Sequence, residues 1–327
     1  MRILVTGGAG FIGSWFVRAV LGGRYPDLAG ASVTVLDKLT YSGNVANLAP
    51  VAGHAGMRLE IGDIGDRMLV DALVPGHDAI VHFAAESHVD RSITDAGRFV
   101  ETNVLGTQVL LDAALRHGTP RFLHVSTDEV YGSIAEGSWD ETAPLAPNSP
   151  YAASKAGSDL LALAYHRTHG LPVVVTRSSN NYGPYQYPEK IIPLFVTNLL
   201  DGRPVPLYGD GHHVRDWLHV DDHCAGIALV LAGGRPGEIY HIGGGTELTN
   251  RELTARLLTA CGAGWDSVEH VADRKGHDER YSLDHTRISR EFGYRPRVGI
   301  TAGLAATVAW YRANRPWWEP LRRGSAG

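Results

Sequence analysis

The amino-acid sequence predicts an α/β protein built on a doubly wound parallel sheet, with a smaller C-terminal α/β lobe. Three observations predict this fold. Strand-like apolar runs alternate with helical patterns over the first 180 residues, a glycine-rich turn follows the first run, and the pattern becomes aromatic and turn-rich after Asn180. Such alternation is typical of βαβ units, whose parallel strands are covered by helices on both faces.

The predicted elements follow one another in that order. Strands are predicted where short runs are apolar or β-branched: residues 2–7, 32–37, 57–63, 78–86, 121–126 and 171–177. Helices are predicted where apolar residues recur with helical spacing: residues 12–21, 96–117, 150–168 and 302–314. The helix over 150–168 has a strong start, because Ser149 can cap it and Pro150 suits its first position. The end of the chain, residues 322–327, is predicted to fray.

The length predicts two structural parts, since 327 residues exceed what one small core needs. We predict that residues 1–180 form the main domain. Residues 181–327 are predicted to form mainly the second lobe, with some segments returning to the main domain.

Composition and charge exclude several classes of function. A net charge of −5 gives no general attraction for nucleic acids or anionic membranes, so neither is expected as a partner. Two cysteines, Cys224 and Cys261, without a framework spacing fit a reducing compartment. A strand pattern begins at Arg2 and no apolar run approaches the length of a membrane span, so we expect a cytoplasmic protein.

The first predicted turn carries a dinucleotide-binding pattern. The sequence ILVTGGAGFIG places Gly7, Gly10 and Gly13 between a strand and a helix. Glycines there allow a tight turn and close approach of a pyrophosphate to the helix N-terminus. Asp37 ends the next strand and can accept hydrogen bonds from ribose hydroxyls, while its charge would repel a 2′-phosphate. The pattern therefore predicts a Rossmann-type domain that binds NAD rather than NADP.

Tyr151 and Lys155 are four residues apart on the helix predicted over 150–168, and so share one face. A tyrosine is a poor base at neutral pH, but a lysine ammonium one turn away stabilises its phenolate. The pair can therefore remove a proton from a substrate hydroxyl while hydride leaves to NAD. An ordinary pair on a helix surface is the alternative; the dinucleotide pattern upstream favours catalysis.

Two adjacent carboxylates, Asp128 and Glu129, follow the strand predicted over 121–126. Neighbouring side chains of a regular strand point to opposite faces, so a strand that continued would separate the two. They can be a charged helix start capped by Ser126 or Thr127, or a matched acid and base. Both interpretations require the strand to stop by Ser126 or Thr127.

The chain resembles the extended short-chain dehydrogenases/reductases, and among them the nucleotide-sugar 4,6-dehydratases that act on dTDP-glucose. The resemblance extends to about Asn314 and rests on STDEVYG, AAESHVDRSI, YAASKA, NNYGPYQYPEKIIPL, VRDWLHVDDH and DRKGHDERY. It implies C4 oxidation, elimination of water across C5 and C6, and return of hydride to C6. NAD would stay tightly bound and be regenerated at each turnover, and the protein would be a homodimer through the helices near 96–117 and 150–168.

The resemblance also implies residue roles. Thr127 would polarise the C4 oxygen, Asp128 would protonate the departing C6 hydroxyl, and Glu129 would remove the C5 proton. The predicted NAD-binding residues are Gly7, Gly10, Phe11, Ile12, Gly13, Asp37, Lys38, Leu39, Thr40, Asp63, Ile64, Phe83, Ala84, Ala85, Ser87, Thr102, Tyr151, Lys155 and Asn181. The predicted substrate-binding residues are Ser87, Thr127, Asn180, Glu189, Lys190, Ile191, Pro206, Tyr208, Arg215, Asn250, Arg274 and His277.

Three alternatives remain at this point. A UDP-sugar 4-epimerase or decarboxylase would share the glycine and tyrosine–lysine motifs without needing the acid pair. A non-catalytic NAD-sensing regulator would be expected to lack Tyr151 or Lys155. The histidines of HHVRDWLHVDDH, with His219 and His223 at zinc-like spacing, suggest a metal site, but no HExxH is present and we predict none. Thymine and uracil both remain possible as the base of the substrate.

Overall fold

A computed structural model describes residues 1–323 of the chain. Residues 324–327, most of the end predicted to fray, lie outside the described part. The strands are β1 (Arg2–Thr6), β2 (Ser32–Asp37), β3 (Met57–Ile61), β4 (Ala79–His82), β5 (Phe122–Thr127), β6 (Val173–Ser178), β7 (Asn180–Tyr182), β8 (Val205–Tyr208), β9 (Val214–His219), β10 (Ile239–Ile242), β11 (Glu247–Thr249) and β12 (Val268–Val271). The helices are α1 (Phe11–Leu21), α2 (Arg67–Leu73), α3 (Val89–Thr94), α4 (Ala96–Phe99), α5 (Thr107–Arg116), α6 (Pro150–His169), α7 (Ile191–Leu200), α8 (Val220–Gly233), α9 (Asn250–Cys261), α10 (Thr286–Phe292), α11 (Ile300–Ala313) and α12 (Arg315–Arg323).

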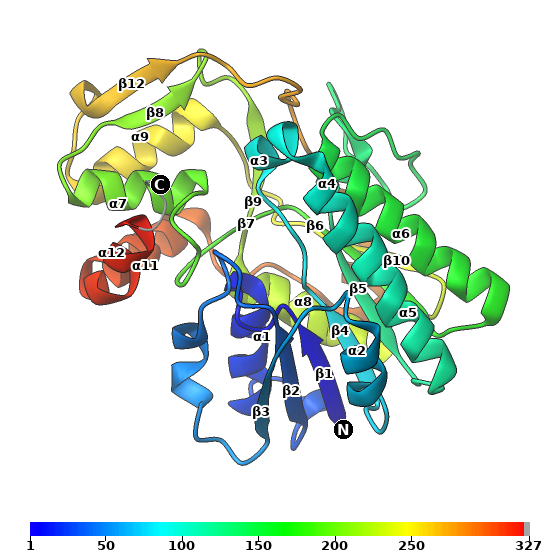
Figure 1. The fold of residues 1–327 in the computed structure, drawn as a ribbon. Helices are drawn as coiled ribbons and strands as arrows, with labels where there is room; N and C mark the ends of the chain where they lie inside the picture. The colour runs from blue at the N-terminus through cyan, green and yellow to red at the C-terminus, as the bar shows by residue number, and fades with distance from the viewer. Residues whose placement is uncertain (324–327) are drawn as a thin grey trace.

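Seven parallel strands form the central sheet in the order β10-β6-β5-β4-β1-β2-β3 (Figure 1). The order reverses between β1 and β4, and ligands of doubly wound sheets bind in the crevice outside the carboxyl ends of the strands at such a point. The predicted α/β fold is confirmed. All six predicted strands are present; the strand over 32–37 has the predicted bounds, and the other five differ at one or both ends by one to four residues.

Helices cover both faces of this sheet, as its near-continuous apolar strands require. One core joins the sheet to α1, α8 and α10, and includes Val5, Phe16 and Ile227. The other joins it to α2, α5 and α6, and includes Leu4, Leu110 and Leu163. Because β10, which follows α8 in the sequence, forms the edge of the sheet next to β6, part of the C-terminal half is built into the main sheet.

The second lobe has its own core and lies over the carboxyl ends of the main strands (Figure 1). Helices α7, α9 and α11 pack together there around Phe195, Leu257 and Tyr311. Two small sheets, β11-β9-β7 and β12-β8, complete it. Helix α12 was not predicted, and the buried side chain of Trp318 anchors it in this core.

The helix predicted over 96–117 is confirmed as one continuous path, with an irregular middle. Between α4 and α5, residues Val100–Gly106 form a π-helical stretch. Such stretches are rare and are often found at functional sites. Here Asn103 lies in it, and its side-chain amide donates to Glu86 O at 3.0 Å and to Ser154 Oγ at 2.8 Å. The stretch thereby ties the segment after β4 to α6.

None of the helices in residues 1–323 combines the length and the apolar character needed to cross a lipid bilayer.

Candidate active site

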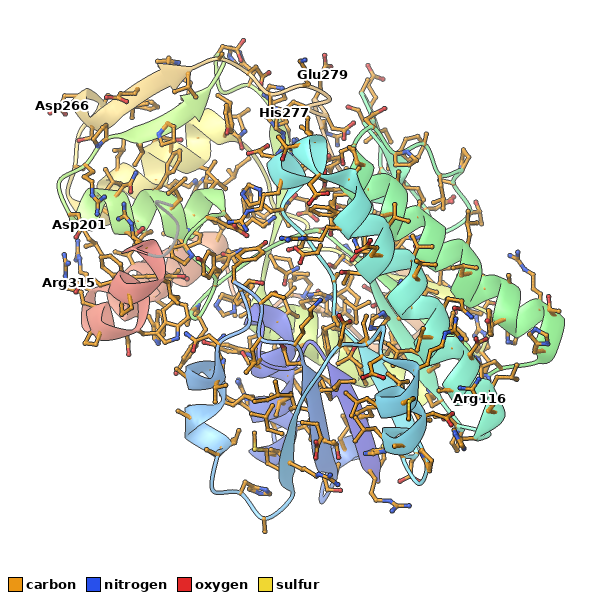
Figure 2. All side chains as sticks on the ribbon, viewed as in Figure 1. Arg116, Asp201, Asp266, His277, Glu279 and Arg315 are labelled. Carbon is orange, nitrogen blue, oxygen red and sulfur yellow. The ribbon has the colours of Figure 1, made fainter. Side chains whose placement is uncertain are left out.

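A cavity of about 1150 Å³ lies between the carboxyl ends of the main strands and the second lobe. Its walls include every residue predicted to bind cofactor or substrate except Leu39. Leu39 has a positive φ of 54°, and its backbone N–H donates to Asp37 Oδ1 at 2.8 Å. It therefore helps to orient Asp37 instead of facing the cavity. Figure 2 shows the side chains of both parts on the ribbon, with His277 of the cavity wall labelled.

The turn between β1 and α1 is closed by backbone contacts that exclude side chains. Gly7 has a φ of 69°, and a Cβ there would lie 2.6 Å from Ala84 N. A Cβ on Gly13 would collide with the carbonyl oxygen of Gly7. The N-terminus of α1, a helix of 11 residues, faces the cavity through Phe11 and Ile12. This glycine cradle fits the pyrophosphate of a dinucleotide.

Asp37 lies at the end of β2, in the cavity wall, and is mostly buried. Its Oδ2 accepts from Ala9 N at 2.9 Å, which links it to the glycine turn. Burial raises the pKa of Asp37, and the hydrogen bonds from Leu39 and Ala9 offset only part of that rise. The two backbone donors leave further lone pairs for ribose hydroxyls, so the residue fits NAD.

The strand β5 stops at Thr127, as the acid pair requires. Residues Asp128–Tyr131 form a single 3₁₀ turn, with Thr127 as its N-cap accepting from Glu129 N at 3.3 Å. The turn brings Asp128 and Glu129 into the same cavity wall. The charged-cap interpretation and the catalytic one are therefore compatible.

The two carboxyl groups differ in their surroundings. Asp128 is 2% exposed, and its Oδ2 is buried without a hydrogen-bond partner. Burial, with the neighbouring Glu129 charge second, raises the pKa of Asp128 well above its ordinary value. Burial also raises the pKa of Glu129, but the charges of Lys190, Arg274 and Arg215 oppose that rise. Of the pair, Asp128 is the better proton donor and Glu129 the better base.

Tyr151 and Lys155 lie on the first turns of α6, which Ser149 caps by accepting from Ala152 N at 3.1 Å. Lys155 Nζ donates to Val125 O at 2.8 Å. Burial lowers the pKa of Lys155 to about 8, against the pull of Asp159. Burial, with the charge of Glu129 second, raises the pKa of Tyr151, and a hydrogen bond with Thr127 offsets only part of that rise. An additional positive charge beside Tyr151 would therefore be needed to make its phenolate accessible near neutral pH.

Cationic side chains also line the cavity. Arg215 is 5% exposed, and its guanidinium donates to the backbone oxygens of Val214 at 2.7 Å and Asp278 at 2.8 Å. Among residues 1–323 no carboxylate forms an ion pair with it. Arg274 lies 3.6 Å from Asp90, and Lys190 Nζ donates to Ser87 O at 2.6 Å. A buried guanidinium without an anionic partner fits an oxyanion from a ligand.

Some cavity residues were not predicted from the sequence. Tyr281 supports Arg215, whose guanidinium carbon lies 4.2 Å from the centre of its ring. His88 caps α3 and lies 3.7 Å from Glu189. Both stand inside segments that carried the resemblance, DRKGHDERY and AAESHVDRSI, so the signal was present without an assigned role.

His219 and His223, whose spacing suggested a metal site, contact different partners. His219 Nδ1 accepts from Asp221 N at 3.2 Å, and His223 Nδ1 is 2.9 Å from Asn181 Oδ1. Within residues 1–323, only His213, Asp273 and His277 bring three groups of the metal-ligating kind together.

Comparison with known proteins gives consistent results. The family model for GDP-mannose 4,6 dehydratase matches residues 4–307. A dTDP-glucose 4,6-dehydratase of Streptomyces niveus is 69% identical over 98% of this chain and 96% of its own length. The structure of the dTDP-glucose 4,6-dehydratase DesIV of Streptomyces venezuelae, solved with NAD bound, is 68% identical with a TM-score of 0.97, over 98% of this chain and all of that one. A UDP-glucose 4-epimerase of Thermus thermophilus, also with NAD, has a TM-score of 0.87 but is 34% identical, over 96% of this chain and 100% of that one.

Proposed function

This chain belongs to the dTDP-glucose 4,6-dehydratase family, and we propose that it is an NAD-dependent hydro-lyase converting dTDP-glucose to the 4-keto-6-deoxy sugar. The observation that carries the proposal is the acid pair after β5. Asp128 and Glu129 share one cavity wall with Tyr151 and Lys155, and an enzyme that only oxidises and reduces C4 has no use for that pair.

NAD bound on the glycine turn supplies the hydride acceptor and, later in the same turnover, the hydride donor. Tyr151 removes the proton of the C4 hydroxyl, and the Lys155 ammonium stabilises the phenolate electrostatically. Thr127 forms a side-chain hydrogen bond with Tyr151 and also hydrogen-bonds the C4 oxygen of the substrate. Val125 O fixes the position of the ammonium, because it accepts from Lys155 Nζ.

The C4 ketone acidifies the hydrogen on C5, which allows a carboxylate to remove it. Glu129 takes that proton, since Lys190, Arg274 and Arg215 favour its ionised form. Asp128 gives its proton to the departing C6 hydroxyl, since burial and the Glu129 charge hold it protonated. Arg215 and Arg274 hold the diphosphate, for which a planar guanidinium is well suited. In this proposal residues 1–180 form the NAD-binding domain, and residues 181–327 form mainly the substrate-binding lobe, with some segments returning to the main domain.

We propose further that the protein is a homodimer in the cytoplasm. Val100, between α4 and α5, and Leu160 on α6 are exposed by 47% and 56%, on the helices through which the resemblance implies dimerisation. Apolar side chains that remain exposed in a monomer are available to an interface. Both cysteines are free thiols, as a reducing compartment favours.

A direct assay tests the proposed activity and the preference for thymine or uracil in the substrate together. The purified protein is incubated with dTDP-glucose or UDP-glucose, and the 4-keto-6-deoxy product is quantified. We expect turnover with dTDP-glucose to exceed that with UDP-glucose. An epimer, or unchanged sugar in both reactions, would contradict the proposed activity.

A further inference from the structure

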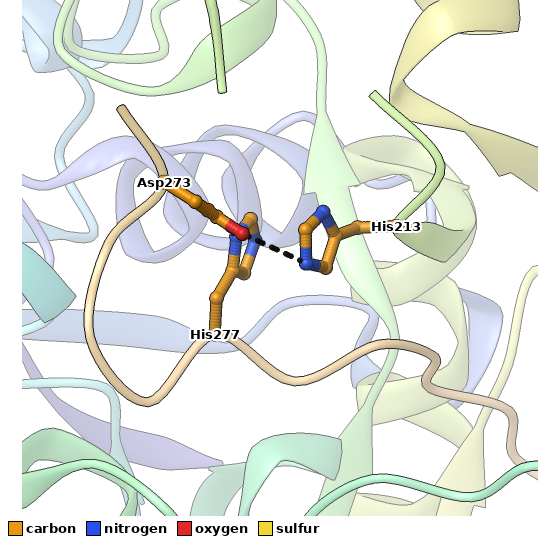
Figure 3. Close-up of side chains that lie close together, drawn as sticks. All are labelled: His213, Asp273 and His277. Carbon is orange, nitrogen blue, oxygen red and sulfur yellow. Dashed lines mark hydrogen bonds and ion pairs between the residues drawn. The ribbon is translucent and has the colours of Figure 1, made fainter. Parts of the chain in front are cut away.

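His213 has no role in the account above, although it lies against a predicted substrate residue. It stands just before β9, on the segment that leads to Arg215. Its ring is stacked on that of His277, with centroids 3.6 Å apart and planes at 15° (Figure 3). Figure 2 places His277 on the loop that follows β12, beside α3. The stack thus joins two segments that are far apart in the sequence.

Asp273 connects the two rings. Its Oδ1 lies 2.7 Å from His277 Nδ1, and its Oδ2 lies 3.3 Å from His213 Nε2. A carboxylate can only accept, so Nδ1 of His277 carries a proton and donates it to Asp273. The same Oδ1 accepts from Arg274 N at 2.8 Å, which fixes the loop itself. The nitrogen of His277 that remains for a ligand is Nε2, on a residue that lines the cavity.

The stacked arrangement does not suit a metal ion. Imidazole lone pairs lie in the ring plane, and a ligating nitrogen is about 2.0 to 2.1 Å from zinc. An ion between two parallel rings 3.6 Å apart would lie far outside both planes. The geometry instead holds His277 in one orientation.

The charges around His277 point to an anion as its partner. The groups that face it are Tyr208 of β8, His213 and Arg215 at β9, Asp273 and Arg274 on its own loop, and Asp90 of α3, which lies beside Arg274 and Tyr208. Burial and the charge of Arg274 lower the pKa of His277 to about 4, although Asp273 opposes them. A bound diphosphate would neutralise the two arginines and reverse the sign of the field at Nε2.

His213 is suited to remain neutral beside this change. Burial lowers its pKa, and its Nδ1 is buried without a hydrogen-bond partner, so a second proton there would have no acceptor. A neutral ring stacked on His277 can support an imidazolium, whereas a second cation would repel it.

We propose that His213 and Asp273 are positioning residues that hold the His277 ring so that its Nε2 binds the diphosphate of the nucleotide sugar, with uptake of a proton. This inference rests on the proposed function. Neutral His277 with its proton on Nδ1 presents only a lone pair at Nε2, which repels phosphate oxygens. The proton taken up from solvent at Nε2 turns that repulsion into a charge-assisted hydrogen bond.

Substitutions at His213 separate the stack from the contact with Asp273. His213→Ala removes both, and His213→Phe keeps a flat ring without a donor. We expect His213→Ala to raise KM for dTDP-glucose about threefold to tenfold with kcat changed by less than about twofold, the range of an aromatic contact. His213→Phe should retain KM within about twofold of the wild type. His212→Ala is the matched control, because this exposed neighbour bonds only Asp210 and should change neither constant.

Proton linkage provides a readout that a purely structural role would not change. The probe is dTDP-4-deoxy-4-fluoroglucose, which has no C4 hydroxyl to oxidise and whose diphosphate does not titrate near neutral pH. Calorimetry in buffers of different ionisation enthalpy at pH 6.5 should show net proton uptake approaching about one per ligand for the wild type, and none for His277→Asn.

Each outcome decides the proposal. If the wild type binds the probe and turns over dTDP-glucose but takes up no proton, the inference is wrong and the proposed function still stands. The inference is also wrong if folded His213→Ala has an unchanged KM. It is equally wrong if the wild type binds Zn²⁺ tightly and His213→Ala loses that binding. If His213→Ala does not fold, the comparison of His213→Phe, His277→Asn and the wild type still tests the claim. Absence of any turnover of dTDP-glucose would instead contradict the proposed function.

Discussion

Replacing Asp128 by asparagine removes the proton donor of the elimination step and leaves the shape of the site intact. Asp128 is 2% exposed, and its unpaired Oδ2 is the atom available to the C6 hydroxyl. A positioned general acid contributes about 10²- to 10⁴-fold, which corresponds to about 2.7 to 5.4 kcal/mol of barrier. We expect the Asp128→Asn variant to eliminate water more slowly by that factor, while C4 oxidation by Tyr151 and Lys155 continues.

Rapid mixing of the variant with dTDP-glucose measures the two steps separately. Because hydride leaves C4 before water is lost, reduced cofactor should accumulate and give a transient NADH absorbance larger than that of the wild type. Glu129→Gln is the informative partner: it should also accumulate NADH, but without exchange of the C5 hydrogen with solvent, which Asp128→Asn should still allow.

The refuting result is specific. If Asp128→Asn keeps its melting temperature and its NAD content but shows no NADH transient, Asp128 acts before the elimination and the division of roles is wrong. Wild-type turnover by this variant would equally contradict its role as the proton donor.

Three further predictions concern the cofactor site, the lysine and the buried histidines. Gly13→Ala should lose most of the NAD bound to the purified protein, because the new Cβ collides with Gly7 O. Gly53→Ala is the control and should keep its NAD, because a Cβ there meets open space. Ultraviolet spectra of the two purified proteins measure the bound NAD. Lys155→Met should lower the rate of C4 oxidation, measured as the NADH transient, by about 10²-fold or more. The melting temperature of this variant at pH 7 should not fall, because burial of the ammonium costs folding free energy and lowers the pKa of Lys155 to about 8. Burial lowers the pKa of His124 to about 4 and those of His223 and His241 to about 3, so the unfolded chain binds more protons than the folded one between these values and about 6.5. The free energy of unfolding should therefore fall as the pH falls from 6.5 toward 4, by up to about 1.4 kcal/mol per pH unit for each histidine. Urea unfolding measures this free energy, and equal values at pH 7 and pH 5 would contradict the prediction.

Local sequence patterns predicted the parts of the fold that depend on neighbouring residues. The six main strands, the start of α6 at Ser149 and Pro150, and the end of β5 at Thr127 all follow from periodicity, caps and the chemistry of the acid pair. The π-helical stretch at Val100–Gly106 did not, because its hydrogen-bond pattern leaves no mark in the apolar spacing.

Features that depend on distant segments escaped prediction. The pairing of β8 with β12 joins segments about sixty residues apart, and only packing in the second lobe determines it. Helix α12 forms despite Pro320, since Trp318 is fully buried in that lobe. The stack of His213 on His277 depends on the same long-range arrangement. By contrast, the glycine turn, Asp37 and the acid pair could be singled out because they follow predicted strands, whereas the substrate-side residues of the cavity were named through the family resemblance alone.

The most direct test of the central claim is the NMR spectrum of the product made from dTDP-glucose in heavy water. The proton that Glu129 removes from C5 is replaced from solvent, and the hydroxyl that Asp128 protonates leaves C6. We therefore expect a methyl group at C6 and deuterium at C5. A product that retains its C6 hydroxyl and carries hydrogen at C5 would contradict the account.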